Sequence, residues 1–291
     1  MNHKKLIKRI YLVSILLTLL TALLLTLSFV TSFDNVNGYF NEGILPILFR
    51  IILIAGILLA IGSAFFIPKK EIIKTEDSIE KHKNAYLILA VALLICAVGS
   101  CLITTVGQPM SPTIDELRFQ FLIRFTLAIL GAFSFALFIL LCALKGGYKY
   151  HPLKVLFLLF SALFPVLINM VNETNLYRHT NSAENVLTAV FAISLLVYIL
   201  YEGKRIFLGE HSRWHFVGML LVSHTGLSLS ISYVIAYLFG AVNEETRLYQ
   251  IAIILLISAF VEIELVRFVL TSNLHSKEEV KEEETKEETN E

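Results

Sequence analysis

Long apolar runs alternate with short polar segments along almost the whole chain. Eight such runs lie at about 10–30, 44–67, 85–106, 119–144, 153–170, 186–202, 215–239 and 248–270. Each run is close to the roughly 20 residues that a helix needs to cross a bilayer. Because lipid offers the backbone no hydrogen-bond partners, each run is expected to be helical. The pattern predicts an all-α integral membrane protein, a bundle of eight transmembrane helices arranged as four hairpins.

The polar segments between these runs are too short to form a soluble domain. The longest are the loop at about 68–84 and the segment after residue 271. The latter is rich in Glu and Lys and lacks apolar periodicity, which is typical of disorder. We therefore predict a transmembrane domain over residues 1–271 and a disordered, charged cytoplasmic tail over residues 272–291.

Composition favours the same class of protein. Of the 291 residues, 56% are hydrophobic and only 16% are charged, whereas soluble domains carry about 25% charged residues. The net charge is zero, so the composition gives no reason to expect a nucleic-acid partner. The lipid bilayer is the expected surrounding. The three cysteines lie inside predicted spans, where small buried hydrophobes are expected, and no metal cluster or cofactor is predicted.

The distribution of Lys and Arg predicts the orientation. The chain begins with Lys4, Lys5, Lys8 and Arg9. If this end is cytoplasmic, every inner connection is basic, and the outer connections hold only Arg118, Arg178 and Arg247. This asymmetry follows the positive-inside rule. The first run exceeds the 7–15 residues or so of a secretory signal core, so we expect an uncleaved span. We predict a multi-pass protein of the cell membrane with both termini cytoplasmic.

Ionisable side chains inside the predicted spans are candidates for function, because a charge in lipid is costly. In the last span, Glu264 and Arg267 are three residues apart and are expected to pair. Glu262 points about 200° away from Glu264. An antiparallel arrangement of the last two spans places His224 level with Glu262 and Glu264. Two interpretations remain open: a His224–Glu262 pair that relays protons, and ordinary hydrogen bonds between helices.

The seventh run is the most polar. It carries Ser223, His224, Thr225, Ser228, Ser230, Ser232 and Tyr233. Ser228 joins His224 and Glu262 in the candidate intramembrane polar site. His211 and His215 are four residues apart near its start, a spacing that suits two metal ligands. No third ligand accompanies them, so an ordinary polar helix start is the favoured interpretation.

Two arginines complete the set of candidates. Arg50 and Arg124 lie at matched positions of the second and fourth runs, one or two turns from the outer surface. Either both extend toward the outer headgroups, or both point inward and form an anion-binding pair. In the fifth run, Pro165 removes one backbone hydrogen bond and predicts a kink.

The pattern of candidates favours transport or permeation of a small solute or ion. Its basis is the polar seventh span, Glu262 and the two arginines. The alternative is a non-transporting receptor, assembly factor or accessory subunit of a membrane complex, which would use the charged cytoplasmic loop and tail to bind a protein partner. No GxSxG, HExxH, P-loop or GxGxxG arrangement occurs, so no enzyme class is predicted. The sequence leaves the oligomeric state open.

Overall fold

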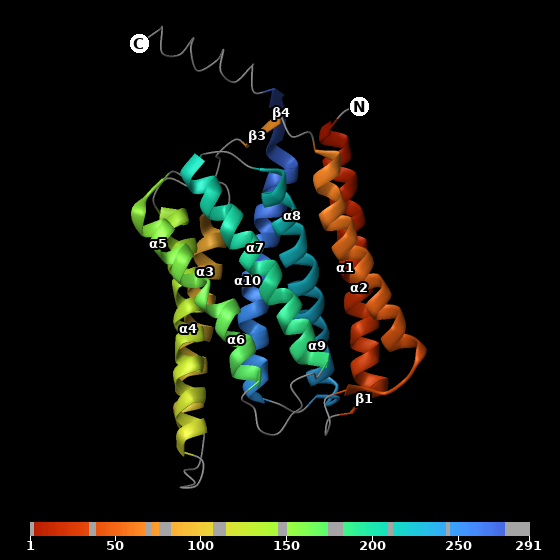
Figure 1. The fold of residues 1–291 in the computed structure, drawn as a ribbon, viewed down its shortest axis with the longest axis vertical. Helices are drawn as coiled ribbons and strands as arrows, with labels where there is room; N and C mark the ends of the chain where they lie inside the picture. Colours follow the sequence, from red (N-terminus) through yellow and green to blue (C-terminus); the bar gives the residue numbers. More distant parts are fainter. Residues whose placement is uncertain are drawn as a thin grey trace.

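The computed structural model describes residues 3–34, 39–67, 71–75, 83–106, 115–144, 150–173, 183–208, 212–242 and 245–276. These residues form a bundle of long helices that run roughly side by side (Figure 1). Six helices among them are long and apolar enough to cross a membrane. An apolar helical bundle of this kind is the expected form of a polytopic membrane protein.

Each of the eight apolar runs is helical over nearly its whole length. The first four correspond to α1 (His3–Ser32), α2 (Ile44–Phe66), α3 (Lys83–Val106) and α4 (Asp115–Leu144). The others are α5 (Pro152–Ser161) with α6 (Leu163–Glu173), α7 (Ala183–Leu208), α8 (Arg213–Val222) with η3 (Ser223–Leu227) and α9 (Ser228–Leu238), and α10 (Glu245–Thr271). The sequence placed the end of the sixth run at residue 202, but α7 continues for six more residues to Leu208.

Two of the runs contain irregular turns. The fifth is interrupted at Ala162, between α5 and α6. Pro165 lacks the N–H that would bond the carbonyl of Ser161, and its ring crowds that carbonyl, so the predicted kink occurs one turn before the proline. In the seventh, η3 is one turn of π-helix between α8 and α9. This turn was not predicted from the hydropathy pattern.

Short strands occupy two of the connections. β1 (Phe33–Asp34) pairs with β2 (Tyr39–Phe40) after α1. β3 (Glu71–Thr75) pairs in antiparallel fashion with β4 (Ser272–Ser276), which follows α10 directly. The tail predicted from residue 272 therefore begins with a strand, and residues 277–291 lie outside the described part of the chain. The β3–β4 pair joins the α2–α3 connection to the end of the bundle near both termini (Figure 1).

The helix formed by α8, η3 and α9 is the centre of the bundle. In its most apolar window 78% of residues are buried, compared with 28–33% in α1, α2 and α3. The α1–α2 pair packs against one side of it, and α7 packs against the other, while α10 contacts both α3 and the central helix (Figure 1). A hairpin of α1 and α2 thus faces a larger group formed by α3 to α7, with α8–α10 between them.

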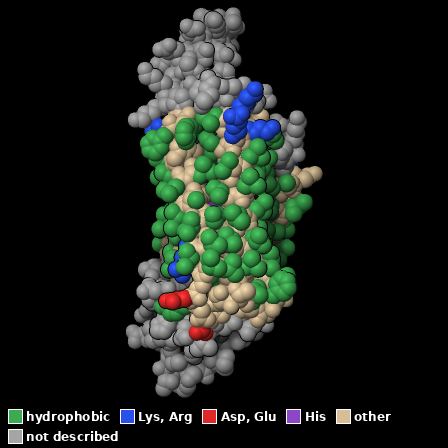
Figure 2. Space-filling view, turned by 90° about the vertical axis from the view of Figure 1, so that its right-hand side faces the viewer, with side chains coloured by type: hydrophobic (Ala, Val, Ile, Leu, Met, Phe, Trp, Pro, Cys, Tyr) green, Lys and Arg blue, Asp and Glu red, His purple; other side chains and the backbone are tan. Residues whose placement is uncertain are grey.

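The surface has the pattern expected of a protein in a bilayer. The face in Figure 2 is covered by apolar side chains over most of its height. Basic side chains gather at one end of this face, and acidic ones lie near the other end beside one basic side chain. Among the described side chains of α1, the exposed basic ones near the N-terminus are Lys5, Lys8 and Arg9. Such charged ends suit the two headgroup regions.

Candidate functional site

The π turn of the central helix presents its polar side chains in different directions. Gly226 lies inside this turn, where an added Cβ would come within 2.0 Å of the Ser258 hydroxyl and 2.7 Å of the Phe191 ring. Only glycine therefore allows α10 and α7 to approach the turn this closely. Single π turns in α-helices are frequent at functional sites, because the extra residue redirects the side chains around it.

His224, in this π turn, faces the α1–α2 hairpin. Its Nδ1 lies 3.0 Å from the Thr18 hydroxyl of α1, and its Nε2 lies 3.3 Å from the Leu53 carbonyl of α2. The ring is fully buried and rests on Gly56, where an added Cβ would lie 2.1 Å from Nε2. Thr18 is 15 residues into α1, about 22 Å along its axis. His224 therefore lies near the middle of the bundle.

Glu262 faces the seam between α1, η3 and α10. It accepts a hydrogen bond of 2.7 Å from the Tyr11 hydroxyl and a second from the Ser223 hydroxyl. Both Tyr11 and Glu262 are half-buried. Among the residues whose side chains the structure describes, no cationic group forms an ion pair with Glu262.

The predicted contact between His224 and Glu262 is not formed. The antiparallel register was right to within one residue, because Glu262 meets Ser223, the chain neighbour of His224. Successive helical residues point about 100° apart. His224 therefore turns toward α1 and α2 while Ser223 turns toward α10, so a relay through direct contact of the two candidates is wrong.

Hydroxyl groups continue the polar interior beyond His224. Ser228 donates to the His224 carbonyl at 2.5 Å, so its hydroxyl is used within its own helix. Ser232 donates to the Ala22 carbonyl of α1 at 2.8 Å. The hydroxyl of Thr21, also buried on α1, has no hydrogen-bond partner within the described part of the chain. We call the polar track the set Tyr11, Ser14, Thr18, Ser223, His224, Ser228, Ser232 and Glu262.

Aromatic rings close the track at the end away from the termini. Phe29 of α1 contacts Tyr233 of α9, with ring centroids 6.0 Å apart, and Phe33 and Phe40, each at 5.1 Å. Phe40 in turn contacts Phe49 of α2 at 5.4 Å. In this conformation the track therefore meets an apolar barrier at this end, while its other end, at Glu262, is half-buried.

The two candidate arginines do not form a pair. Arg50 is exposed on α2, with its guanidinium carbon 6.0 Å from the Phe49 ring centre. Arg124 is half-buried on α4. Figure 1 shows α2 and α4 on opposite sides of the bundle. The anion-binding interpretation is therefore wrong, and an outward orientation of Arg50 toward the headgroups remains.

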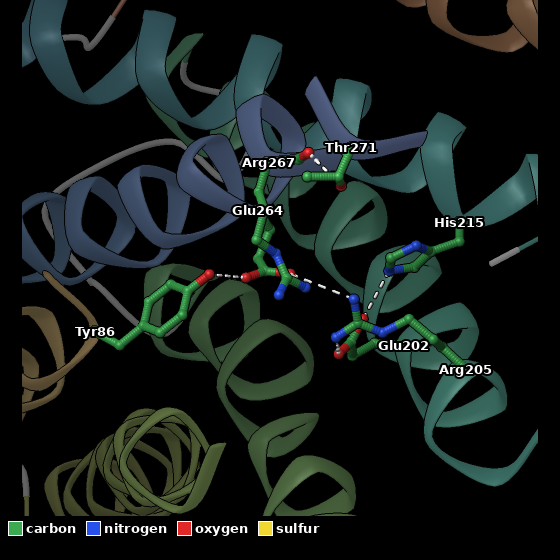
Figure 3. A network of polar contacts seen from close by, with 7 residues as sticks. All are labelled: Tyr86, Glu202, Arg205, His215, Glu264, Arg267 and Thr271. Carbon is green, nitrogen blue, oxygen red and sulfur yellow. Dashed lines mark hydrogen bonds and ion pairs between the residues drawn. The ribbon is translucent and has the colours of Figure 1, made fainter. Parts of the chain in front are cut away.

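A buried ionic network, of which only the Glu264–Arg267 pair was predicted from the sequence, lies on the face of α10 opposite Glu262. Glu264 forms ion pairs with Arg267 at 3.1 Å and with Arg205 of α7 at 3.3 Å. The first of these confirms the predicted pair. Glu264 also accepts a hydrogen bond from Tyr86 of α3. Arg205 further contacts Glu202 at 2.6 Å. Figure 3 shows these side chains converging from three helices.

His215 of α8 extends this network to a fourth helix. Its Nε2 lies 2.7 Å from Glu202, and its ring stacks on Tyr198 with centroids 5.7 Å apart. His215 is therefore engaged by a carboxylate. His211, its partner in the metal-ligand hypothesis, lies outside the described residues. The described residues contain no group of three or more potential metal ligands.

The ionic network acts as a clamp, because its ion pairs join α7 to α8 and to α10. Its two glutamates and two arginines balance, and each of these four residues is at most 4% exposed. Lys154 at the start of α5 is also fully buried. The i, i+3 spacing of Glu202 and Arg205 was visible in the sequence. This pair was not predicted because the sixth run was ended at residue 202. Arg205 was then assigned to the solvent-exposed connection after the span.

A cavity of about 200 Å³ lies between α3 and α4. It is lined mainly by apolar side chains, including Ala97, Ile129 and Phe133. Its lining includes no residue of the polar track or of the ionic network, so it does not enlarge the candidate site.

The chain matches no protein-family model, no curated protein and no solved structure. Its function is therefore inferred from its own residues.

Proposed function

We propose that this protein carries a small solute or ion across the cell membrane along the polar track. The observation that supports this proposal is the track itself, a row of hydroxyl, imidazole and carboxylate groups on the side of α8–α10 that faces α1 and α2, apart from the ionic network. Apolar side chains would suffice to pack α1 and α2 against α8–α10. Titratable groups at this depth are costly and most often mark ion or substrate paths.

The proposed arrangement has eight spans in four hairpins, with both termini cytoplasmic. Each predicted run is a helix, and the exposed Lys5, Lys8 and Arg9 lie at the end that carries the termini. Glu262 would then open toward the cytoplasmic headgroup region, since Tyr11 is only two residues beyond Arg9. The aromatic rings around Phe29 would close the outer end. A transport cycle must open that end, and the α1–α2 hairpin is the element placed to move.

Flux in proteoliposomes tests the proposal. Purified protein is reconstituted, and uptake of monovalent ions and small polar solutes is compared for wild type, Glu262→Gln and His224→Ala. Both variants should lower the flux of at least one species strongly. Glu42→Gln, at an exposed residue before α2, is the matched control and should behave as wild type. Equal flux of every tested species in wild type and both variants would refute the proposal.

A second candidate is a non-transporting subunit of a membrane complex. The pairing of β3 with β4 favours it, because it ties the α2–α3 connection to the start of the C-terminal segment and forms a two-stranded sheet at the proposed cytoplasmic end. Recovery of a stoichiometric partner from native membranes, together with no flux in liposomes, would favour this role over transport.

A further inference from the structure

The two titratable groups of the polar track differ from those of the ionic network in their partners. The hydrogen-bond partners of Glu262 and His224 are hydroxyls and one carbonyl. Glu264, only two residues from Glu262, is bound by two arginines. On one helix, therefore, the charge of one carboxylate is fixed by guanidinium groups and that of the other is not.

From this contrast we infer that the ion handled by the track is the proton, and that Glu262 and His224 are the groups that bind it. The inference rests on the proposed function and names its ion. The inference adds to the proposed function a separate protonation site at each of the two residues, in place of the direct pair that the structure excludes.

The hydrogen bonds around His224 suit both protonation states of the ring. Thr18 has one O–H, and it lies within reach of both the Ser14 carbonyl, at 2.8 Å, and Nδ1 of His224, at 3.0 Å. When Thr18 donates to Ser14, its oxygen accepts from Nδ1–H, while Nε2–H donates to the Leu53 carbonyl. That ring carries both protons and is charged.

When Thr18 turns its O–H toward Nδ1, the same ring is neutral and keeps only the Nε2 proton. Uptake of a proton on Nδ1 therefore requires one hydroxyl to rotate and no heavy atom to move. The reverse rotation accompanies release. A site built only for packing would not need a partner that can both donate and accept.

Glu262 has the same property. As a carboxylate it accepts from the Tyr11 and Ser223 hydroxyls. When a proton binds to the oxygen facing Ser223, the new carboxylic O–H donates to the Ser223 oxygen, and the Ser223 O–H turns away. Since Glu262 is half-buried, this proton can exchange at the cytoplasmic headgroup region. Ser223 is also the chain neighbour of His224, which makes it the shortest link between the two sites.

On the elements around Glu262, the other titratable groups whose side chains the structure describes have different partners or face elsewhere. His215 pairs with Glu202, and Tyr86, Glu264 and Arg267 bond within the ionic network. Arg213 of α8 donates to the Ala64 carbonyl. Lys5, Lys8 and Arg9 of α1 are exposed, and Tyr233 and Tyr237 of α9 lie at the far end of the track. The groups in direct contact with Glu262 are thus hydroxyls.

A hard metal cation fits this site less well than a proton. Such cations take about six oxygen ligands, whereas Glu262 brings together its own two oxygens and two hydroxyls. A proton needs one oxygen and one acceptor. Hydroxyls, imidazole and carboxylate are also the groups through which protons move in membrane proteins.

The test measures proton uptake into liposomes that contain the full-length protein and a pH-sensitive dye, driven by a potassium potential. Glu262→Gln and Thr18→Val should each lower the rate by about a hundredfold or more, which is the usual contribution of a positioned proton-transfer group. Thr18→Ser restores the hydroxyl and should recover most of the rate. Glu42→Gln is the control, and replacing sodium with choline should change nothing.

A second readout does not depend on transport. In lipid nanodiscs, acidification should produce an infrared carbonyl band of a protonated carboxylic acid that is missing in Glu262→Gln and shifted in Tyr11→Phe. If a solute is transported at a rate that does not depend on the proton gradient and the infrared band is absent, this inference is overturned and the transport proposal stands. The band without flux of any species would support the proton site and refute transport.

Discussion

Gly56→Ala tests the placement of His224 by steric means alone, without removing a polar group. The added Cβ would lie 2.1 Å from Nε2, 2.4 Å from Cε1 and 2.7 Å from Cδ2 of the buried ring. Ordinary contacts between these atoms exceed about 3.4 Å, so the ring must retreat by more than about 1 Å, which weakens its bonds to Thr18 and Leu53.

The expected cost follows from these contacts. Overpacking a buried site costs about 1–3 kcal/mol. Two hydrogen bonds between membrane helices contribute about 0.6 kcal/mol each. Gly56→Ala should therefore lower the free energy of unfolding by about 2–4 kcal/mol, measured by unfolding of the purified protein in mixed detergent micelles.

A control and a double mutant separate this effect from helix propensity. Gly62 is on the same helix, and apart from the backbone of that helix and its chain neighbours no atom lies within 4 Å of its added Cβ, so Gly62→Ala should show helix propensity alone and stabilise by at most about 1 kcal/mol. In a His224→Ala background, which vacates the space, Gly56→Ala should cost at least about 1 kcal/mol less than in wild type. Equal effects of the two glycine substitutions, or no relief from His224→Ala, would show that the ring does not rest on Gly56.

Three further predictions concern the network, the tail and the orientation. Glu264→Gln leaves two buried arginines without their shared carboxylate and should lower the free energy of unfolding by about 3–5 kcal/mol in the same assay. Glu42→Gln should lower it little. Equal effects of the two substitutions would show that the ionic network does not clamp the helices. Deletion of residues 277–291, which offer almost no apolar side chains to bury, should leave the melting temperature unchanged, and a fall of several degrees would show that this segment docks. Single cysteines should react with an impermeant reagent outside the cell at Asp34, Glu116, Glu173 and Glu244 but not at Lys74, Lys149 and Glu210; the reverse result would invert the proposed topology.

Some of the candidate site could be found from sequence. Glu262, His224 and Ser223 are polar residues in apolar runs, and the short connection between the last two runs sets their antiparallel register. The i, i+3 spacing of Glu264 and Arg267 predicted their ion pair, which the structure confirms. Each of these inferences uses local helical geometry, where spacing along the chain determines which face a residue occupies.

The partners of those residues were decided by tertiary packing. Whether His224 meets Glu262, Thr18 or Leu53 depends on a rotation of about 100° between neighbouring residues and on the π turn at Ser223–Leu227. Neither can be predicted from hydropathy. A helix that is surrounded by other helices is apolar on nearly every face, so its hydropathy does not show which face meets which neighbour.

What the sequence by itself determined is that every apolar run is a helix, because backbone groups in lipid can be satisfied in no other way within a single segment. Only the tertiary structure decided which helices are neighbours, and with that the inward burial of Glu202 and Arg205, the outward exposure of Arg50, and the partners of Glu262 and His224. The physical reason is that lipid contact and helix contact are both apolar. Hydropathy therefore identifies the spans, while the choice of faces depends on close packing at glycines and on polar groups that find partners several helices away.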